Sequence, residues 1–222
     1  MSTVPGPVHH HKKTADQLEN ALSLLDEKLA DLDTTIEIKA IGGFALMKHG
    51  IREDDRAYTV DIDSVTRDYS RHVVDAIADV ARENNLDEGW LNNYNVIDND
   101  PDQVEQMIQA RWIPQQTSLQ NITLSIADVP TLTRSKIIAA ADAEFSGREQ
   151  DQPDLFALVR KQGIQNVSQF RQRYPDPWDE YTPAYEDVAA RFRREYQQRF
   201  PELSQPDDEL ETANDFEDDF DL

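Results

Sequence analysis

Two different spacings of apolar residues occur along the chain, and together they predict a mixed α+β fold. Leucines three or four residues apart predict a helix that begins after Thr14, where Gln17 completes a capping box. Alternating apolar and polar residues predict short strands over 35–41, 58–63 and 122–126. The leucines of the first helix are Leu18, Leu22, Leu25, Leu29 and Leu32.

Helical spacing dominates the second half of the chain. We expect a small mixed β-sheet flanked by helices, followed by a C-terminal helical region, because the predicted strands all lie before residue 130. Residues 86–94 are predicted to form a loop. Further helices are predicted over 44–49, 70–85, 100–109, 132–145, 153–162, 166–173 and 182–200. The expected organisation is a disordered N-terminus at 1–13, a folded domain at 14–164, a helical appendage at 165–201 and an acidic disordered tail at 202–222.

Composition narrows the classes of function. The formal net charge is −22, with 44 acidic and 22 basic residues, and the stretch 202–222 contains ten acids and no base. Such a surface repels nucleic-acid phosphate and argues against broad, non-specific nucleic-acid binding, although a local basic cleft remains compatible with it. The absence of cysteine excludes disulfides, zinc–thiolate sites and cysteine nucleophiles. No apolar run approaches 18 residues and no secretory segment is evident, so we expect a cytoplasmic protein without a membrane span.

Candidate chemistry begins with two acids in one predicted strand. Alternation places Asp61 and Asp63 on the same face, where two carboxylates repel each other unless a cation lies between them. Mg²⁺, with substrate phosphates completing its shell, suits such oxygen ligands. Gly42 and Gly43 follow the preceding strand, and a backbone without side chains lets a phosphate approach its N–H groups. The alternative is a pair of exposed acids on an edge strand, which is common in so acidic a chain.

The stretch 42–66 (GGFALMKHGIREDDRAYTVDIDSVT) resembles the signature of the minimal nucleotidyltransferases of the DNA polymerase β-like superfamily, in particular the AbiEii-type nucleotidyltransferase toxins. Gly42 and Gly43 match the glycine turn of that family, and Asp61 and Asp63 match its metal-binding carboxylates. The domain at 14–164 is therefore expected to be nucleotidyltransferase-like.

A second stretch, 132–164 (LTRSKIIAAADAEFSGREQDQPDLFALVRKQGI), resembles the family pattern of a helical lysine followed by a charged cluster. On this pattern Lys136 is the motif lysine, and Arg148, Asp151 and Asp154 form the cluster. The residues alone also allow a surface lysine at 136 and an ordinary helix start at Asp151, shortly before Pro153.

The superfamily usually has a third carboxylate on a later strand. Asp98 and Asp128 are both candidates for this position. If neither approaches Asp61 and Asp63, the resemblance is compatible with nucleotide binding without turnover.

The resemblance implies a Mg²⁺-dependent nucleotidyltransferase. It would transfer a nucleoside monophosphate from an NTP to a hydroxyl of RNA or protein, in a toxin or phage-defence role beside a partner antitoxin. In this scheme Asp61 and Asp63 hold Mg²⁺, Gly42 and Gly43 hold the triphosphate, and Lys136 neutralises charge on it. The acidic composition favours a protein acceptor over RNA. The alternative is a catalytically silent nucleotide-binding or protein-interaction module.

Overall fold

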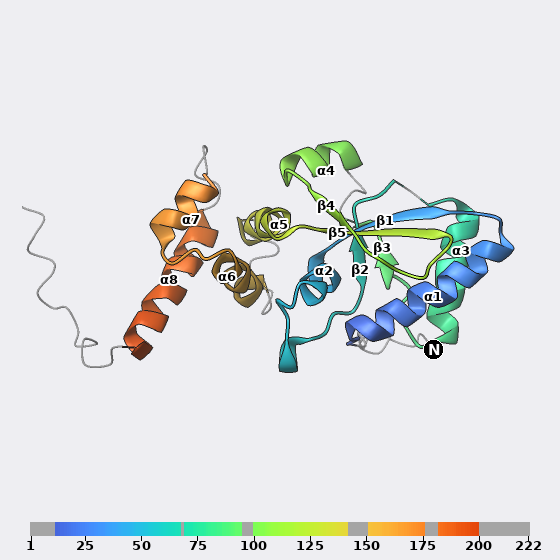
Figure 1. The fold of residues 1–222 in the computed structure, drawn as a ribbon, viewed down its shortest axis with the longest axis horizontal. Coiled ribbons are helices and arrows are strands. Elements are labelled where there is room, and N and C mark those ends of the chain that lie inside the picture. The colour runs from blue at the N-terminus through green and yellow to red at the C-terminus, as the bar shows by residue number, and fades with distance from the viewer. Residues whose placement is uncertain (1–11, 68, 95–99, 142–150, 176–181, 200–222) are drawn as a thin grey trace, which may run out of the picture.

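A five-stranded mixed sheet in the order β3-β2-β1-β5-β4 forms the centre of the fold (Figure 1). The computed structural model describes residues 12–67, 69–94, 100–141, 151–175 and 182–199. β1 runs antiparallel to β2 and parallel to β5, and it therefore occupies the middle of the sheet. The strands are β1 (Ile36–Ile41), β2 (Ile62–Ser64), β3 (Leu91–Asn92), β4 (Trp112–Pro114) and β5 (Ile122–Ala127).

Helices surround this sheet and form the C-terminal part of the described chain, which confirms the predicted α+β class. They are α1 (Ala15–Asp31), α2 (Gly42–Lys48), the short 3₁₀ helix η1 (Asp54–Arg56), α3 (Arg71–Glu83), α4 (Pro101–Met107), α5 (Val129–Ala141), α6 (Asp151–Lys161), α7 (Val167–Arg173) and α8 (Thr182–Arg199). In the described part of the chain, none of the helices combines the length and the apolar character that crossing a membrane requires.

Local capping explains where several helices begin. At α1 the predicted capping box is confirmed: Gln17 N donates to Thr14 Oγ1 at 3.3 Å, and Thr14 N donates to Gln17 Oε1 at 3.0 Å. At α4 the Asp100 carboxylate accepts from Asp102 N at 2.9 Å, and Pro101 occupies the first turn. These bonds satisfy backbone N–H groups that have no partner inside the helix.

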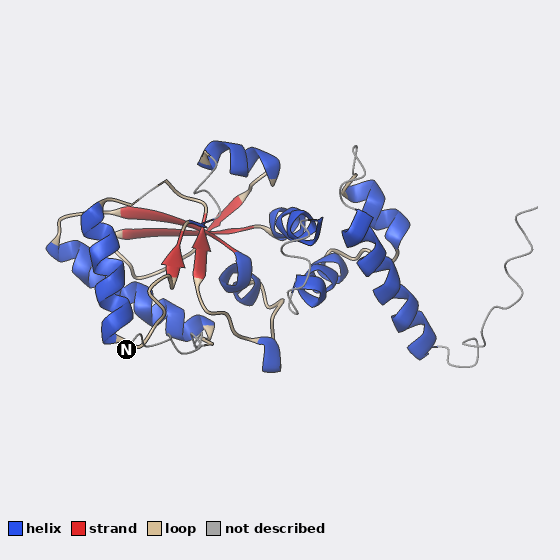
Figure 2. Ribbon diagram, turned by 180° about the vertical axis from the view of Figure 1, so that it is seen from behind, coloured by secondary structure: helices blue, strands red, loops and turns tan. Residues whose placement is uncertain are grey.

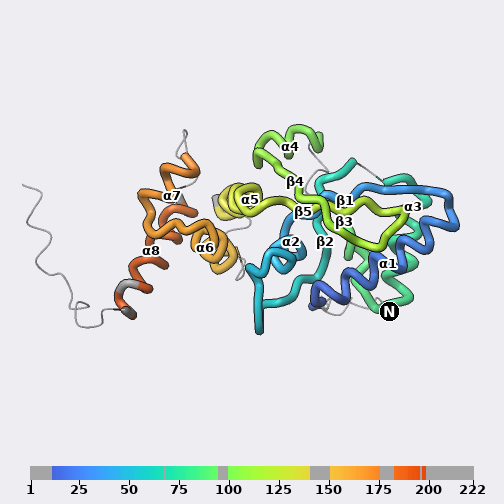
Figure 3. Tube along the Cα trace, viewed as in Figure 1, coloured from blue at the N-terminus to red at the C-terminus, as the bar shows by residue number. Residues whose placement is uncertain are grey.

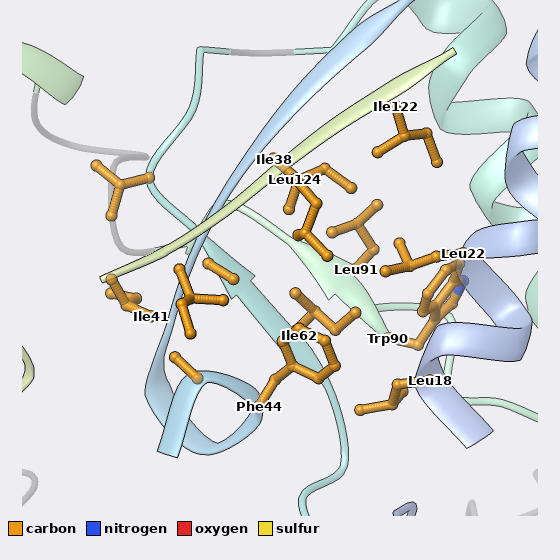
Figure 4. Packing of buried hydrophobic residues seen from close by; sticks show 14 of the residues in the cluster. Leu18, Leu22, Ile38, Ile41, Phe44, Ile62, Trp90, Leu91, Ile122 and Leu124 are labelled. Atoms are coloured by element: carbon orange, nitrogen blue, oxygen red, sulfur yellow. The ribbon is translucent and has the colours of Figure 1, made fainter. Parts of the chain in front are cut away.

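The main hydrophobic core lies between the sheet and the helices α1, α2 and α3 (Figure 4). Leu18 and Leu22 of α1 face the strands, and Phe44 of α2 lies beside Ile62 of β2. Trp90 is fully buried in this core, and its indole N–H donates to Ile77 O at 3.1 Å. The indole thus contributes apolar area without leaving an unmatched donor.

A second core lies among α5, α6, α7 and α8, at the end of the molecule away from α1 and α3 (Figures 1 and 3). The same separation is visible from behind (Figure 2). α5 joins the two cores, because its Leu132 belongs to the first and its Ile137 to the second. The other buried residues of the second core include Leu155, Val159, Phe170, Tyr185 and Val188.

The sheet differs from the prediction at three places. β3 lies inside the segment 86–94 that was predicted as a loop, and β4 was not predicted. Both are two or three residues long, too short for an apolar alternation to be visible. β2 begins at Ile62 rather than at residue 58, and Thr59 instead pairs with Lys13 in an isolated bridge, with Lys13 N donating to Thr59 O. Residues 1–11 and 200–222, which contain most of the two segments predicted to be disordered, lie outside the described residues.

Candidate functional site

The predicted site residues of the first motif meet at one edge of the sheet. β1 ends at Ile41, and α2 begins directly at Gly42. Because β2 is antiparallel to β1, with Asp63 opposite Ile41, the start of β2 lies at this same edge. Asp61 immediately precedes β2, and Asp63 within β2 lies beside Gly42.

Gly42 and Asp63 are in close contact. Gly42 has φ = +65°, a backbone conformation that side chains disfavour. An ideal Cβ at Gly42 would lie 2.3 Å from Asp63 Oδ2. Position 42 therefore requires glycine for two reasons, its backbone angle and the carboxylate that occupies the space of a side chain.

Gly43 accommodates two other polar side chains. An ideal Cβ there would lie 2.3 Å from Thr59 Oγ1 and 2.7 Å from Arg52 Nη1. We expected the glycines to leave room for a phosphate. The structure shows that the protein's own Asp63, Thr59 and Arg52 occupy the side of the turn where Cβ atoms would project.

Asp61 is held by neighbours from two segments. Thr59 Oγ1 donates to Asp61 Oδ1 at 3.5 Å, and Asn92 Nδ2 donates to Asp61 Oδ2 at 3.2 Å. Asn92 lies on β3 and is 5 % exposed, and its amide also donates to Gly89 O at 3.1 Å. These contacts fix the orientation of a half-buried carboxylate.

A buried ionic pair lies beside Gly43. Arg52 is 7 % exposed and Asp154 is fully buried. Arg52 Nε donates to both carboxylate oxygens of Asp154 at 3.1 Å, and Arg52 Nη2 donates to Oδ2 at 2.6 Å. The remaining nitrogen, Nη1, donates to Tyr58 O at 2.8 Å. Each of the three guanidinium nitrogens of Arg52 thus donates to an acceptor within the protein.

Three more charged side chains surround Asp154. Lys136 Nζ forms an ion pair with Asp151 and lies 3.5 Å from Asp154 Oδ2. Arg56 Nη1 lies 3.7 Å from Asp154 Oδ1. We call the five side chains the ionic cluster. Its members are Arg52, Arg56, Lys136, Asp151 and Asp154, and their formal charges sum to +1 within a chain whose net charge is −22.

The two motifs are therefore neighbours in space. Arg52 contacts both the Gly43 turn and Asp154, which connects the glycine motif to Lys136, Asp151 and Asp154 of the second motif. Four residues near these motifs are not predicted by the sequence patterns: Arg52, Arg56, Thr59 and Asn92. Arg52 and Arg56 lie within the stretch 42–66, but no local pattern distinguishes them from other charged residues there.

Asp128, one of the two candidates for the third carboxylate, caps a helix. Asp128 precedes α5, and its Oδ1 accepts from Thr131 N at 2.8 Å, which is the geometry of a helix cap. Asp98 and Arg148 lie outside the described residues. Within the residues described, no group of three or more His, Cys, Asp or Glu side chains is arranged to hold a metal ion. Asp61 and Asp63 offer the hard oxygen donors that fit Mg²⁺, whose remaining ligands are commonly water and phosphate.

Comparisons of this chain with protein-family models, with curated proteins and with solved structures found no match.

Proposed function

We propose that the protein is a Mg²⁺-dependent nucleotidyltransferase that transfers a nucleoside monophosphate from an NTP to a hydroxyl of RNA or protein. The main support for this proposal is that Arg52 contacts both the Gly43 turn and Asp154. The two stretches that resemble the family, 42–66 and 132–164, are therefore adjacent in the fold. The carboxylates of Asp61 and Asp63, which suit a cation, therefore lie in the same region of the fold as the ionic cluster, whose net charge is positive. Transfer of a phosphoryl-linked group needs both of these features.

Each residue has a role in this scheme. Asp61 and Asp63 would hold Mg²⁺, which when bound supplies Lewis-acid stabilisation of the phosphate oxygens. Backbone N–H groups of Gly42 and Gly43 would donate to the triphosphate, and Lys136 would offset its charge. The acceptor hydroxyl forms a bond to the α-phosphorus, the bond to pyrophosphate breaks, and the hydroxyl proton passes to a base. Asn92 and Thr59 keep the Asp61 carboxylate oriented during this step.

A second candidate is a catalytically silent module that binds nucleotides or a protein partner. The observation that favours it is that, among the described residues, no third acid joins Asp61 and Asp63 in a group arranged to hold a metal ion. Such a module would retain affinity for nucleotide, because the ionic cluster does not depend on a third acid.

Incubation of the protein with each labelled NTP, Mg²⁺ and cell extract separates the two candidates. Label on RNA or protein that disappears in Asp61→Asn and Asp63→Asn, and persists in the control Asp75→Asn at an exposed position of α3, supports the enzyme. Nucleotide binding with no transfer for any NTP supports the silent module. A net charge of −22 favours a protein acceptor, because RNA phosphate is repelled.

The resemblance to AbiEii-type toxins also supports a toxin or phage-defence role with a partner antitoxin. Induced expression in bacterial cells tests it. Growth arrest by the wild-type chain and normal growth with Asp61→Asn would agree with the proposal, whereas equal growth of both strains would contradict it.

A further inference from the structure

Asp61 and Asp63 differ in how the sheet holds them. Asp63 lies within β2, opposite Ile41 of β1 and against Gly42, so the pairing of the two strands and the glycine turn fix its position. Asp61 lies one residue before β2, in the segment 57–61 that joins η1 to the sheet. Apart from one isolated bridge, this segment belongs to no helix or strand. The position of Asp61 therefore depends on the other contacts that the segment makes.

Lys12 and Lys13 supply several of these contacts, and we call these two residues the N-terminal clamp. Lys13 N donates to Thr59 O at 2.6 Å, and Thr59 N donates to Lys13 O at 2.9 Å. Lys12 Nζ lies 3.8 Å from the centroid of the Tyr58 ring, which is a cation–π contact. The clamp thus holds two consecutive residues of the segment, one through its backbone and the other through its side chain.

The clamp is itself anchored to the folded domain. The next residue, Thr14, caps α1, and the inward-facing leucines of α1 are buried in the main core. Lys13 Nζ donates to Asn85 O at 3.0 Å, just beyond the end of α3. Because α1 and α3 both restrain Lys13, its two backbone hydrogen bonds restrain Thr59 in turn.

Thr59 connects the clamp to the candidate site. The residue is 7 % exposed, and its hydroxyl donates to Asp61 Oδ1 at 3.5 Å. The same hydroxyl oxygen would lie 2.3 Å from an ideal Cβ at Gly43. One buried residue thus contacts the clamp, the glycine turn and a candidate metal ligand, so a shift of Thr59 changes the surroundings of the Asp61 carboxylate.

We propose that the N-terminal clamp, acting through Thr59, fixes the position of the Asp61 carboxylate and so sets the affinity of the candidate site for a metal ion. This inference rests on the proposed function, because it assigns positioning residues to the same metal site. Lys13 is such a positioning residue, since it acts through Thr59. Displacement of residues 12 and 13 from Thr59 therefore weakens the metal site without altering a ligand.

Two substitutions at position 13 test the backbone bridge. Lys13→Pro removes the N–H group that donates to Thr59 O, whereas Lys13→Ala keeps this group and removes the side-chain contact with Asn85. The measurement is titration of the full chain with Mn²⁺, followed by electron paramagnetic resonance. Lys13→Pro should lower the affinity by about threefold or more, and Lys13→Ala by less than about twofold. Equal affinities of the two variants would overturn the role of the bridge.

A double-mutant cycle tests the route through Thr59. Thr59→Val removes the hydroxyl that donates to Asp61 and keeps a side chain of nearly the same shape. Lys13→Pro should therefore lower the Mn²⁺ affinity less in the Thr59→Val chain than in the wild-type chain, because both changes act on one contact. Fully additive effects would contradict this route.

Val188→Ala controls for lower stability, because Val188 is fully buried in the second core and its truncation leaves the clamp intact. This variant should bind Mn²⁺ as the wild-type chain does. An affinity as low as that of Lys13→Pro would make stability the cause of the loss and would overturn the inference.

Amide hydrogen exchange separates this inference from the proposed function. In Lys13→Pro, exchange should become faster at Thr59, Asp61 and Ile62, whether or not a metal ion binds. Unchanged exchange at Asp61 together with unchanged Mn²⁺ affinity would overturn the inference and leave the proposed function intact. Faster exchange at Asp61 in a protein whose wild-type chain binds no Mn²⁺ would support the clamp and overturn the proposed metal site.

Discussion

The guanidinium of Arg52 donates three hydrogen bonds to the carboxylate of Asp154, although the two residues are 102 positions apart. One partner lies in the loop after α2, and the other lies on α6. The same loop continues to Thr59 and Asp61. The position of a predicted metal ligand therefore depends on a contact with the helical part of the chain.

Replacement of Arg52 by methionine should destabilise the protein by about 3 kcal/mol or more, because it leaves Asp154 charged and buried without its partner. The measurement is the free energy of unfolding from urea titration. Arg82→Met removes an exposed ion pair and should cost less than about 1 kcal/mol. Similar decreases in the free energy of unfolding for the two variants would contradict the importance assigned to the buried Arg52–Asp154 pair.

Gly43→Ala should destabilise the protein by about 1–3 kcal/mol, the usual cost of forcing extra atoms into a packed site. The new Cβ would approach Thr59 Oγ1 to 2.3 Å, so Thr59 and the neighbouring Arg52 would have to move. Gly89→Ala is the control, because its nearest neighbour lies at 3.2 Å and belongs to the exposed Tyr94 side chain. The measurement is the midpoint temperature of thermal unfolding for both variants. Equal midpoints would show that Thr59 and Arg52 can move away from the new Cβ at little cost.

Much of the architecture could be predicted, because local patterns determine it. The spacing of leucines defines α1, and the Thr14–Gln17 box fixes where this helix begins. Alternation over six residues reveals β1 and β5. The parallel pairing of these two strands could not be predicted in the same way, because it joins segments more than 80 residues apart in the sequence.

The candidate site could be predicted from the sequence only in part, for a related reason. The aspartates and glycines form a short local pattern, but the partners that orient them come from elsewhere. Asn92 lies on a two-residue strand, and Arg52 and Asp154 are 102 positions apart. No local periodicity links such residues, so their roles become apparent only from the tertiary structure.

Asn92→Ala should weaken metal binding at Asp61 by about tenfold, the lower end of the effects found when a residue that orients a metal ligand is lost. The asparagine donates to Asp61 Oδ2 at 3.2 Å and restricts where that oxygen points. Titration with Mn²⁺ followed by electron paramagnetic resonance measures the affinity. The adjacent Asn93→Ala is the comparison variant and should have less effect, since the Asn93 amide donates to Thr66 O at 3.4 Å. Undiminished Mn²⁺ affinity in Asn92→Ala would argue against Asp61 as a ligand.

Alkaline pH should destabilise the fold through two residues that line a groove of about 390 Å³ beside α4. Burial raises the pKa of Tyr69, and the hydrogen bond that Lys39 Nζ donates to Glu105 at 2.7 Å raises the pKa of Lys39. Above about pH 10 the unfolded chain loses these protons first, so it binds fewer protons than the folded chain and stability falls as the pH rises. The free energy of unfolding falls by at most about 1.4 kcal/mol per pH unit for each of the two groups.

Tyr69→Phe separates the contribution of the phenol from that of the lysine. The variant loses the hydrogen bond from Thr66 Oγ1 at 3.1 Å and should be less stable at neutral pH. It should nevertheless lose less stability than the wild-type chain between about pH 9 and 11, because the buried ionisable phenol is absent. Urea midpoints across this range give the comparison, with Tyr94→Phe as the exposed control. Parallel pH profiles for Tyr69→Phe and wild type would rule out a contribution from Tyr69 ionisation.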